Sequence, residues 1–208
     1  MATRLTLEIA GPQAPEAMAA VRSIRQIMYK SRLGIEPSSW QEEDARDCSG
    51  WVFLLRDDGR PVGTFRLTPV SSPLLEMRDL GILPPWAEAE PALCEAARLA
   101  ALPSTDGPRY MVVLLSAIAN WMLAHTGMTD YIAYCRPLAL RLFTEIGGRP
   151  VGSAFHIPER TADTYRVIVG SMRDVAVHWN PEIGPELPPL PSRDGLAFPA
   201  RPEMRLVR

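Results

Sequence analysis

The spacing of apolar residues predicts a set of β-strands along the chain. Apolar and polar side chains alternate, or short apolar runs occur, between turn-forming residues, as expected for strands with buried faces. The predicted strands cover residues 5–9, 51–55, 61–70, 93–102, 130–136, 154–157 and 164–171. The pair 51–55 and 61–70 flanks Asp58-Gly59, a turn signal that predicts a β-hairpin.

Apolar residues at helical spacing predict three helices. They cover residues 15–32, 110–125 and 137–146. Asp106 is the expected N-cap of the second, with Pro108 just inside it. The connection 71–92 is proline-rich and predicted to be irregular, lying over the sheet. This order of elements predicts a mixed α/β domain over residues 1–175, followed by a proline-rich tail at 176–208.

Charged residues interrupt two of the strands. In the second hairpin strand, Phe65 and Leu67 should face one side of the sheet and Arg66 the other, flanked by threonines, which favours a polar pocket over a core position. Glu95 and Arg98 lie within the apolar strand 93–102, where a buried charge needs a partner.

The separation of Glu95 and Arg98 leaves two arrangements open. In a regular strand, residues three apart point to opposite faces. A β-bulge around Ala96-Ala97 would bring both to one face and free a backbone N–H, which could then act as an oxyanion donor. Glu95 could in that case accept a proton from an attacking amine.

A long polar connection, residues 34–50, carries the acids Glu42, Glu43, Asp44 and Asp47. A loop of this length inside a domain is usually functional or mobile. Its acids could form a solvated surface, bind an ammonium group or pair with arginines of the preceding helix. Those arginines, among them Arg25, could equally form a solvated face.

Composition narrows the functional class. The chain has 208 residues, 47% apolar and 22% charged, with a net charge of −2, a balance that disfavours nucleic-acid binding through a basic surface. Its three cysteines and three histidines have no ligand spacing, so we expect no metal site. The sequence shows neither a signal peptide nor an apolar run long enough to span a membrane, so we expect a cytoplasmic protein.

Several short motifs, in order, resemble those of the acyl-homoserine-lactone synthases of quorum sensing and the related N-acyl amino acid synthases. The motifs are Arg25-Gln-Ile-Met-Tyr29 with Leu33-Gly34, Asp44 and Asp47, Gly63-Thr-Phe-Arg66-Leu67, Pro73-Leu-Leu-Glu-Met77, and Glu95-Ala-Ala-Arg98. The resemblance spans roughly residues 5–172. It implies the fold of the GCN5-related N-acetyltransferase superfamily, a mixed, mostly antiparallel sheet splayed between its fourth and fifth strands and flanked by helices.

The resemblance also implies the reaction and its residues. An amine would attack a fatty acyl thioester, carried by an acyl carrier protein or coenzyme A as co-substrate, with no tightly bound cofactor. Glu95 would assist deprotonation, with Arg98 beside it, and Tyr134 would protonate the leaving thiolate. The amine would be bound by Arg25, Tyr29, Asp44, Asp47, Phe65 and Arg66. The thioester carrier would be bound by Leu99, Ala101, Ser104, Thr105, Gly107 and Arg109, where a loop leads into a helix N-terminus suited to anions.

Departures from the family pattern keep alternatives open. Ile35 stands where the lactone synthases usually have tryptophan, Ala97 stands for the serine of Glu-x-Ser-Arg, and the acetyl-coenzyme A loop signature is absent. The alternatives are an ordinary acetyl-coenzyme A-dependent N-acetyltransferase and a non-catalytic protein that binds an acyl ligand. Arg136, Arg141 and Arg149 could meet an acidic carrier protein or be ordinary solvated arginines.

Overall fold

A seven-stranded sheet forms the centre of the computed structural model, which describes residues 5–30, 45–102, 107–157 and 164–177, with the side chains of 107–109 excepted. The strands are β1 (Leu5–Ala10), β2 (Trp51–Asp57), β3 (Arg60–Pro69), β4 (Leu93–Ala101), β5 (Asp130–Cys135), β6 (Arg149–His156) and β7 (Thr164–Ser171). Their spatial order is β1-β2-β3-β4-β5-β7-β6. Every neighbouring pair is antiparallel except β4 with β5, as the predicted mixed sheet requires.

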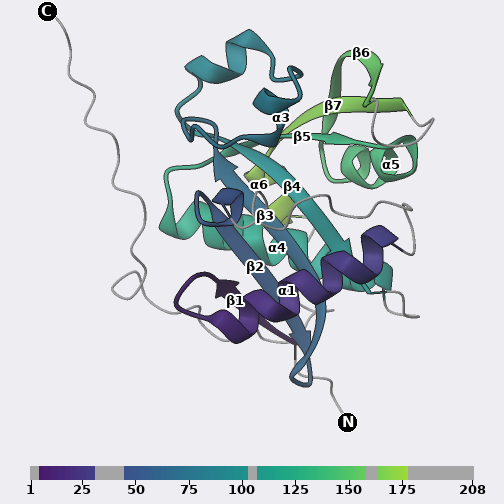
Figure 1. Ribbon diagram of the computed structural model, residues 1–208. Coiled ribbons are helices and arrows are strands. Elements are labelled where there is room, and N and C mark those ends of the chain that lie inside the picture. Colours follow the sequence, from purple (N-terminus) through teal and green to yellow (C-terminus); the bar gives the residue numbers. More distant parts are fainter. Residues whose placement is uncertain (1–4, 31–44, 103–106, 158–163, 178–208) are drawn as a thin grey trace, which may run out of the picture.

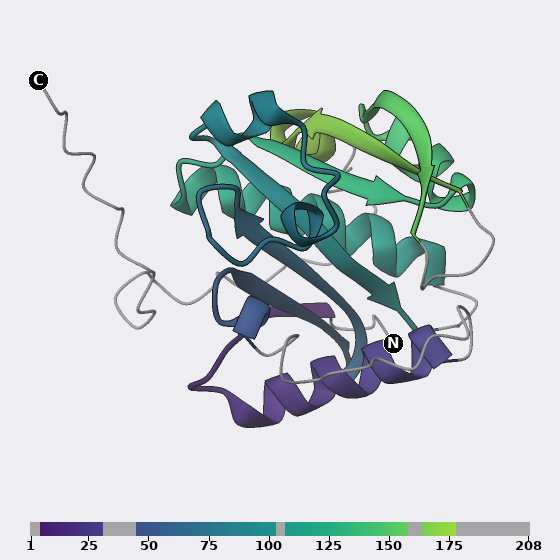
Figure 2. The same cartoon turned by 45° about the horizontal axis from the view of Figure 1, so that its top comes forward.

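Helices cover both faces of this sheet (Figures 1 and 2). They are α1 (Pro15–Met28), α4 (Gly107–His125), α5 (Pro137–Glu145) and α6 (Met172–Val177). Helix α1 packs over β2, β3 and β4 through Val21 and Ile24, which lie against Val52 and Leu54. The larger core lies on the other face, where α4 meets the inward-facing side chains of β2 and β3, such as Phe53 and Phe65.

The splay expected between the fourth and fifth strands is present. Only Leu93, Cys94 and Glu95 pair with β5, in register with Asp130, Tyr131 and Ile132. Both strands continue beyond these pairs, to Ala101 and Cys135. A parallel ladder this short leaves the two strands unpaired with each other over the rest of their length. We refer to this unpaired interval as the β4–β5 gap.

Four elements differ from the sequence prediction. The segment 71–92 contains two short helices, α3 (Glu76–Asp79) and η2 (Pro85–Ala89). Arg78 stabilises this segment by donating hydrogen bonds to the carbonyls of Ser72 and Val70. Strand β6 begins at Arg149 rather than 154, because Gly152, at φ +69°, allows an irregularity within it. The helix α6 was not predicted, and α1 is helical to Met28 while residues 31 and 32 lie outside the described residues.

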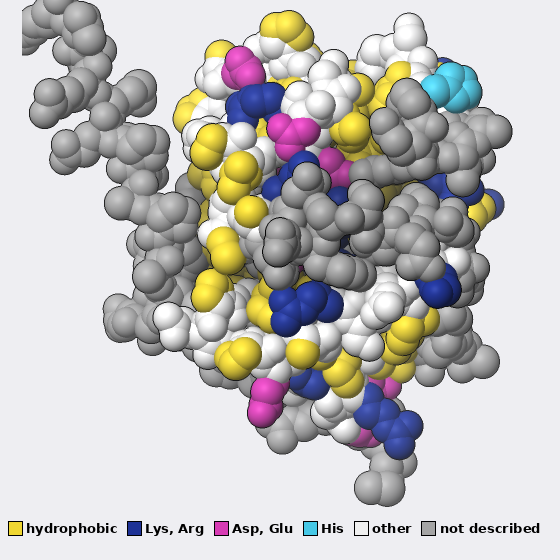
Figure 3. All heavy atoms as spheres, viewed as in Figure 1, with side chains coloured by type: hydrophobic (Ala, Val, Ile, Leu, Met, Phe, Trp, Pro, Cys, Tyr) yellow, Lys and Arg dark blue, Asp and Glu magenta, His cyan; other side chains and the backbone are white. Residues whose placement is uncertain are grey.

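The surface carries both signs of charge. In Figure 3, acidic and basic side chains are interspersed on the face shown, and no large patch of one sign stands out among the described residues. No helix within the described ranges is long and apolar enough to cross a lipid bilayer. The predicted tail at 176–208 lies outside the described residues from 178 onward.

Candidate active site

Two fully buried arginines share one aspartate beneath α1. Arg25 Nη1 lies 2.6 Å from Asp47 Oδ2, and Arg66 Nη1 lies 3.2 Å from Asp47 Oδ1. The two arginine side chains are 0% exposed and that of Asp47 is 1% exposed. Arg25 is therefore not part of a solvated face, and the alternative that it pairs with an acid of the long connection is confirmed for Asp47.

Glu76 extends this cluster to the edge of the β4–β5 gap. Its carboxylate lies 3.5 Å from Arg66 Nη2 and 3.3 Å from Arg98 Nη2. The half-buried Tyr134 of β5 donates its hydroxyl proton to Glu76 Oε1 across 2.6 Å. Glu76 thereby connects groups from β3, β4 and β5, although sequence reasoning gave it no role. In the sequence it stands between the apolar residues Leu75 and Met77, which hints at a buried charge but does not show its partners.

We refer to six residues as the ion network. They are Arg25, Asp47, Arg66, Glu76, Glu95 and Arg98, three guanidinium groups and three carboxylates. Because they balance in formal charge and contact one another, their burial is tolerated. They come from α1, the helical residues 45–47, β3, α3 and β4, and meet on the face of the sheet that α1 covers.

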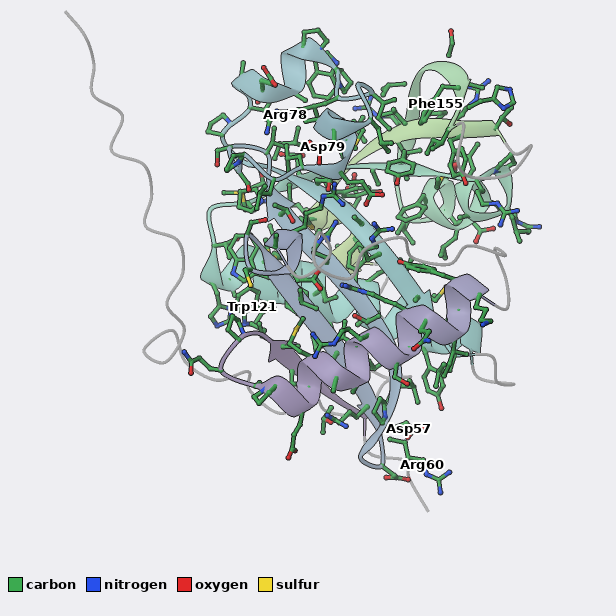
Figure 4. The ribbon with its side chains drawn as sticks, viewed as in Figure 1. Asp57, Arg60, Arg78, Asp79, Trp121 and Phe155 are labelled. Atoms are coloured by element: carbon green, nitrogen blue, oxygen red, sulfur yellow. The ribbon has the colours of Figure 1, made fainter. Side chains whose placement is uncertain are left out.

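Glu95 holds the first turn of α3 in place. Its two carboxylate oxygens accept the backbone N–H groups of Glu76, at 3.2 Å, and Met77, at 2.7 Å. The N-cap residue of α3, Leu75, has no side chain able to accept these protons. Glu95, which lies on the distant strand β4, therefore caps the first turn of α3 and holds Glu76 at the edge of the β4–β5 gap. Figure 4 shows Arg78 and Asp79 of the same segment above the ends of the central strands.

The environment of Glu95 favours its neutral form. Burial raises the pKa of this carboxyl, and the nearby Glu76 carboxylate raises it further. The N–H of Met77 and the Arg66 guanidinium, which lies 3.9 Å away, lower the pKa but do not reverse the shift. A carboxyl with a raised pKa is a stronger base than an ordinary glutamate once it is ionised.

A β-bulge in β4 brings Arg98 to the same face as Glu95. Arg66 pairs with Ala97, and Thr64 pairs with Ala100, so β4 has one residue more than β3 in this interval. Arg98 lies in the left-handed region, at φ +60°. Of the two arrangements left open by the sequence, the structure therefore has the bulge, but the position at Ala96-Ala97 is wrong: it lies at 98–99, because the left-handed residue is Arg98 itself. The Arg98 guanidinium lies over the ring of Tyr29, 5.6 Å from its centroid.

Phe65 points away from the ion network. Its side chain belongs to the core on the α4 face and lines an apolar cavity of about 20 Å³. The other walls come from β3, β4, β5 and the helices of that face: Leu67, Ala96, Leu115, Ile118, Tyr131, Phe143, Ile146, Met172 and Val175. The cavity lies behind the point where β4 and β5 part. The structure therefore does not bring Phe65 together with Tyr29 and Arg66.

The remaining predicted residues are only partly described. Asp44, Ser104 and Thr105 lie outside the described residues, and of Gly107 and Arg109 only the backbone is described, in the first turn of α4. Leu99 lies in the bulge and Ala101 at the end of β4. Arg141 pairs with Glu145 at 2.8 Å as an exposed i,i+4 pair. Cys48, Cys94 and Cys135 are free thiols, and no cluster of metal-binding side chains occurs in the part of the chain that the structure describes.

Comparison with known proteins agrees with this geometry. A family model described as "N-acyl amino acid synthase FeeM" matches residues 20–167. No curated protein sequence matches the chain significantly.

Solved structures share the fold. The chain is similar to FeeM, an N-acyl amino acid synthase from uncultured soil microbes, with a TM-score of 0.68 and 18% identity over 84% of this chain and 94% of that one. It is similar to BjaI, a CoA-dependent acyl-homoserine lactone synthase, with a TM-score of 0.61 and 16% identity over 85% and 87% of the two chains. An IAA acetyltransferase from Bacillus cereus has a TM-score of 0.53 and 12% identity over 81% and 99%.

The family model spans well over half of the chain and includes every residue of the ion network. The seven-stranded sheet with its parallel, splayed β4–β5 pair is the fold of the GCN5-related N-acetyltransferases. The chain belongs to the N-acyl amino acid synthase FeeM family and is an acyltransferase.

Proposed function

We propose that this protein transfers a fatty acyl group from a thioester of coenzyme A or acyl carrier protein to the amine of an amino acid or a related small molecule. The product is an N-acyl amide of the signal type, formed in the cytoplasm. The observation that carries this proposal is the ion network, built over the gap between β4 and β5 with an apolar cavity behind the same gap. One side of the gap suits a charged amine and the other an acyl chain.

The donor is assigned to the β4–β5 gap. A bulge leaves its extra residue outside the regular ladder, and a backbone N–H near Arg98 would donate to the thioester oxygen as negative charge develops there. The carrier would extend along the end of β4, past Leu99 and Ala101, towards the residues at 104–109. The N-terminus of α4 lies there and suits a phosphate. The CoA dependence of BjaI supports coenzyme A as one possible carrier.

The acceptor is assigned to the ion network. An amino acid carries both an ammonium and a carboxylate, and the network offers partners of both signs in equal number. Arg66 and Arg98 would orient the substrate carboxylate, since a planar guanidinium suits bidentate contacts. Asp47 and Glu76 would attract the ammonium, and Tyr29, beneath Arg98, would form a wall of the site.

The reaction needs two proton transfers. The amine nitrogen, once deprotonated, forms a bond to the thioester carbon, and the carbon–sulfur bond of the resulting tetrahedral intermediate then breaks. Glu95 accepts a proton from the amine, directly or through water. The departing thiolate takes a proton from Tyr134, whose hydroxyl is held by Glu76 at 2.6 Å. An acceptor bound as an ammonium loses two protons in all. One is released to solvent, and the other replaces the proton that Tyr134 gives to the thiolate, so that the products are an amide, a free thiol and one proton in solvent.

A second candidate is transfer of a short acyl group from acetyl-coenzyme A. The volume of the apolar cavity favours it, because about 20 Å³ holds roughly one water molecule and no fatty chain without movement of its walls. The fatty acyl proposal therefore requires that side chains such as Phe143 and Met172 shift when the donor binds.

Thiol release separates these candidates. Acetyl, octanoyl, dodecanoyl and palmitoyl thioesters of coenzyme A and of acyl carrier protein are each incubated with pooled amino acids plus homoserine lactone, and the products are identified by mass spectrometry. We expect a long-chain acyl amide that is lost in Glu95→Gln. Release from acetyl-coenzyme A alone would favour the second candidate. Binding of acyl thioesters by folded protein without turnover of any would favour a non-catalytic acyl-binding protein.

A further inference from the structure

Tyr131 of β5 separates the apolar cavity from a second hollow. This hollow has a volume of about 420 Å³ and lies at the starting end of β4 and β5. Its lining is mixed, whereas that of the cavity is apolar: Trp86 and Leu93 lie in it beside the exposed charged side chains of Glu90, Asp130, Arg149 and Asp174. Tyr131 lines both spaces. One side chain therefore stands between an internal apolar space and a surface hollow that carries charged groups.

The hydroxyl of Tyr131 has an unusual environment. The residue is 3% exposed, and its hydroxyl has no hydrogen-bond partner among the described residues. A Cβ added at Gly170 or Gly148 would lie 2.5 Å or 2.7 Å from that oxygen, so glycine at both positions makes room for it. Burial, followed by the nearby Asp174, raises the pKa of Tyr131 to about 12, so the hydroxyl stays protonated near neutral pH.

Packing alone does not account for a tyrosine here. A phenylalanine would fill the same space without burying a hydroxyl that lacks a partner, which is destabilising. Tyrosine suits a boundary with one apolar and one polar side. Its ring borders the apolar cavity together with Phe143, at a centroid distance of 6.3 Å, and Gly170, beside its hydroxyl, lines the hollow that carries the charged side chains.

The position of Tyr131 fits the end of an acyl site. It pairs with Cys94, four residues before Arg98 at the bulge. At the rise of a β-strand this places it about 13 Å along β4 from the assigned position of the thioester carbonyl. A chain that enters the cavity at the bulge and follows β4 therefore meets the Tyr131 ring after a medium length.

We propose that Tyr131 closes the far end of the acyl cavity and sets the upper limit of acyl chain length. This inference rests on the proposed function, since it takes the cavity as the acyl site. Medium chains end against the ring. Longer chains are rejected because Tyr131 lines both spaces among the described residues, and its side chain blocks continuation from the cavity into the 420 Å³ hollow.

The test compares acyl-chain preference in Tyr131 variants. In Tyr131→Ala the two spaces become continuous, and we expect the ratio of kcat/KM for palmitoyl to octanoyl donors to rise at least about tenfold, because each accommodated methylene adds binding energy. Tyr131→Leu, which removes less volume and is safer for folding, should change the ratio in the same direction by a smaller factor. Tyr131→Phe keeps the ring and should leave the ratio near that of the wild type.

A control variant distinguishes a specific effect on acyl-chain preference from a general loss of core packing. Phe53→Ala removes a fully buried ring from the same hydrophobic core but borders neither space, and its ratio should stay unchanged. An unchanged ratio in folded Tyr131→Ala and Tyr131→Leu, with wild-type turnover intact, would overturn this inference alone. Wild-type protein that neither turns over nor binds any acyl thioester, measured by calorimetry, would overturn the proposed function and this inference together.

Discussion

Asp47 is the residue on which the burial of two guanidinium groups depends. It contacts both Arg25 and Arg66, whose side chains have no exposed surface. Coulomb attraction in a site without water is strong, but the cost of removing two guanidinium groups from water is also large. The pairing therefore adds little net stability over an apolar core, whereas removal of the shared carboxylate should strongly lower the free energy of unfolding.

Asp47→Asn should lower the free energy of unfolding by about 3–5 kcal/mol, because it leaves buried positive charge uncompensated. Urea denaturation measures this. Asp79→Asn is the matched control, because its side chain is 49% exposed and pairs with Arg46 at the surface. That change should cost no more than about 1 kcal/mol. Equal effects of the two substitutions would mean that water or another group reaches Asp47.

Glu95 should make stability depend on pH. Its folded-state pKa lies above the ordinary value of 4.5, so the folded protein binds this proton more tightly than the unfolded chain does. The resulting stabilisation is present below pH 4.5 and is lost as the pH rises through the raised folded-state pKa.

Glu95→Gln removes this titration. At low pH the substitution changes the free energy of unfolding by a constant amount. As the pH rises above about 4.5, the free energy of unfolding of the Glu95→Gln variant should increase relative to that of the wild type. Urea titrations at a series of pH values measure the difference. A difference that stays constant or falls across this range would contradict the raised pKa.

Strand periodicity predicted the orientation of Arg66, whereas Arg25, Asp47, Glu95 and Arg98 were named as site residues through the resemblance to the family. Arg66 was placed on the polar face of its strand, opposite Phe65, and the structure agrees. The burial of Arg25 could not be derived, since its partner Asp47 is 22 positions away and helical spacing places the arginine beside the apolar stripe. Glu76 was missed because its contacts come from three other elements. The burial of Arg25 and the contacts of Glu76 both depend on tertiary interactions and not on a local sequence pattern.

At the scale of elements, the bulge in β4 is the feature that assembles the site. A regular strand would direct Arg98 to the α4 face, away from Glu76. A left-handed conformation costs a non-glycine residue roughly 1–2 kcal/mol. The contact of Arg98 with Glu76 and the stacking on Tyr29 offset that cost.

A pair of substitutions tests the backbone of the bulge. Arg98→Gly and Arg98→Ala remove the same guanidinium, but alanine retains the penalty of the left-handed region. We therefore expect the glycine variant to be more stable by about 1 kcal/mol. At Leu99, which is not left-handed, the same comparison should reverse, with alanine more stable. Thermal unfolding of the four variants measures both signs, and alanine being favoured at both positions would contradict the bulge geometry.

Short elements were the least predictable part of the fold. The helix α3 has only four residues, and its first turn depends on the carboxylate of Glu95, 18 and 19 positions away. The helix α6 follows directly from β7 and lies against α4. Neither has enough turns to show a helical period. The long elements, α4 and the β2–β3 hairpin, matched their predictions because their patterns repeat over many residues.

At the scale of the whole molecule, the sheet separates two chemical environments. The ion network lies on the α1 face, and the apolar cavity lies on the α4 face. Adjacent residues of β3, Phe65 and Arg66, belong to opposite environments. An acyl group bound in the gap between β4 and β5 could contact both the ion network on one face of the sheet and the apolar cavity on the other.

Two conservative substitutions should therefore affect different kinetic constants. Phe65→Leu should raise the KM for the acyl donor and leave the KM for the amine near the wild-type value. Tyr134→Phe, which removes the hydroxyl held by Glu76, should lower kcat by about 10²-fold or more with both KM values little changed. Steady-state kinetics with each substrate varied in turn measures this. Equal effects of both substitutions on the amine KM would contradict the separation of faces.

The three-pair ladder between β4 and β5 has a mechanical consequence. It is the only direct hydrogen-bonded seam between the half-sheet β1–β4 and the half-sheet β5–β7 within the described strands. A thioester lying in the gap would occupy the place of the missing ladder and contribute to the cohesion of the two halves. Backbone amides at 96–101 should then exchange with solvent more slowly when a donor analogue is bound, by a factor that follows its affinity. While it is bound, the acyl donor would therefore form part of the connection between the two half-sheets.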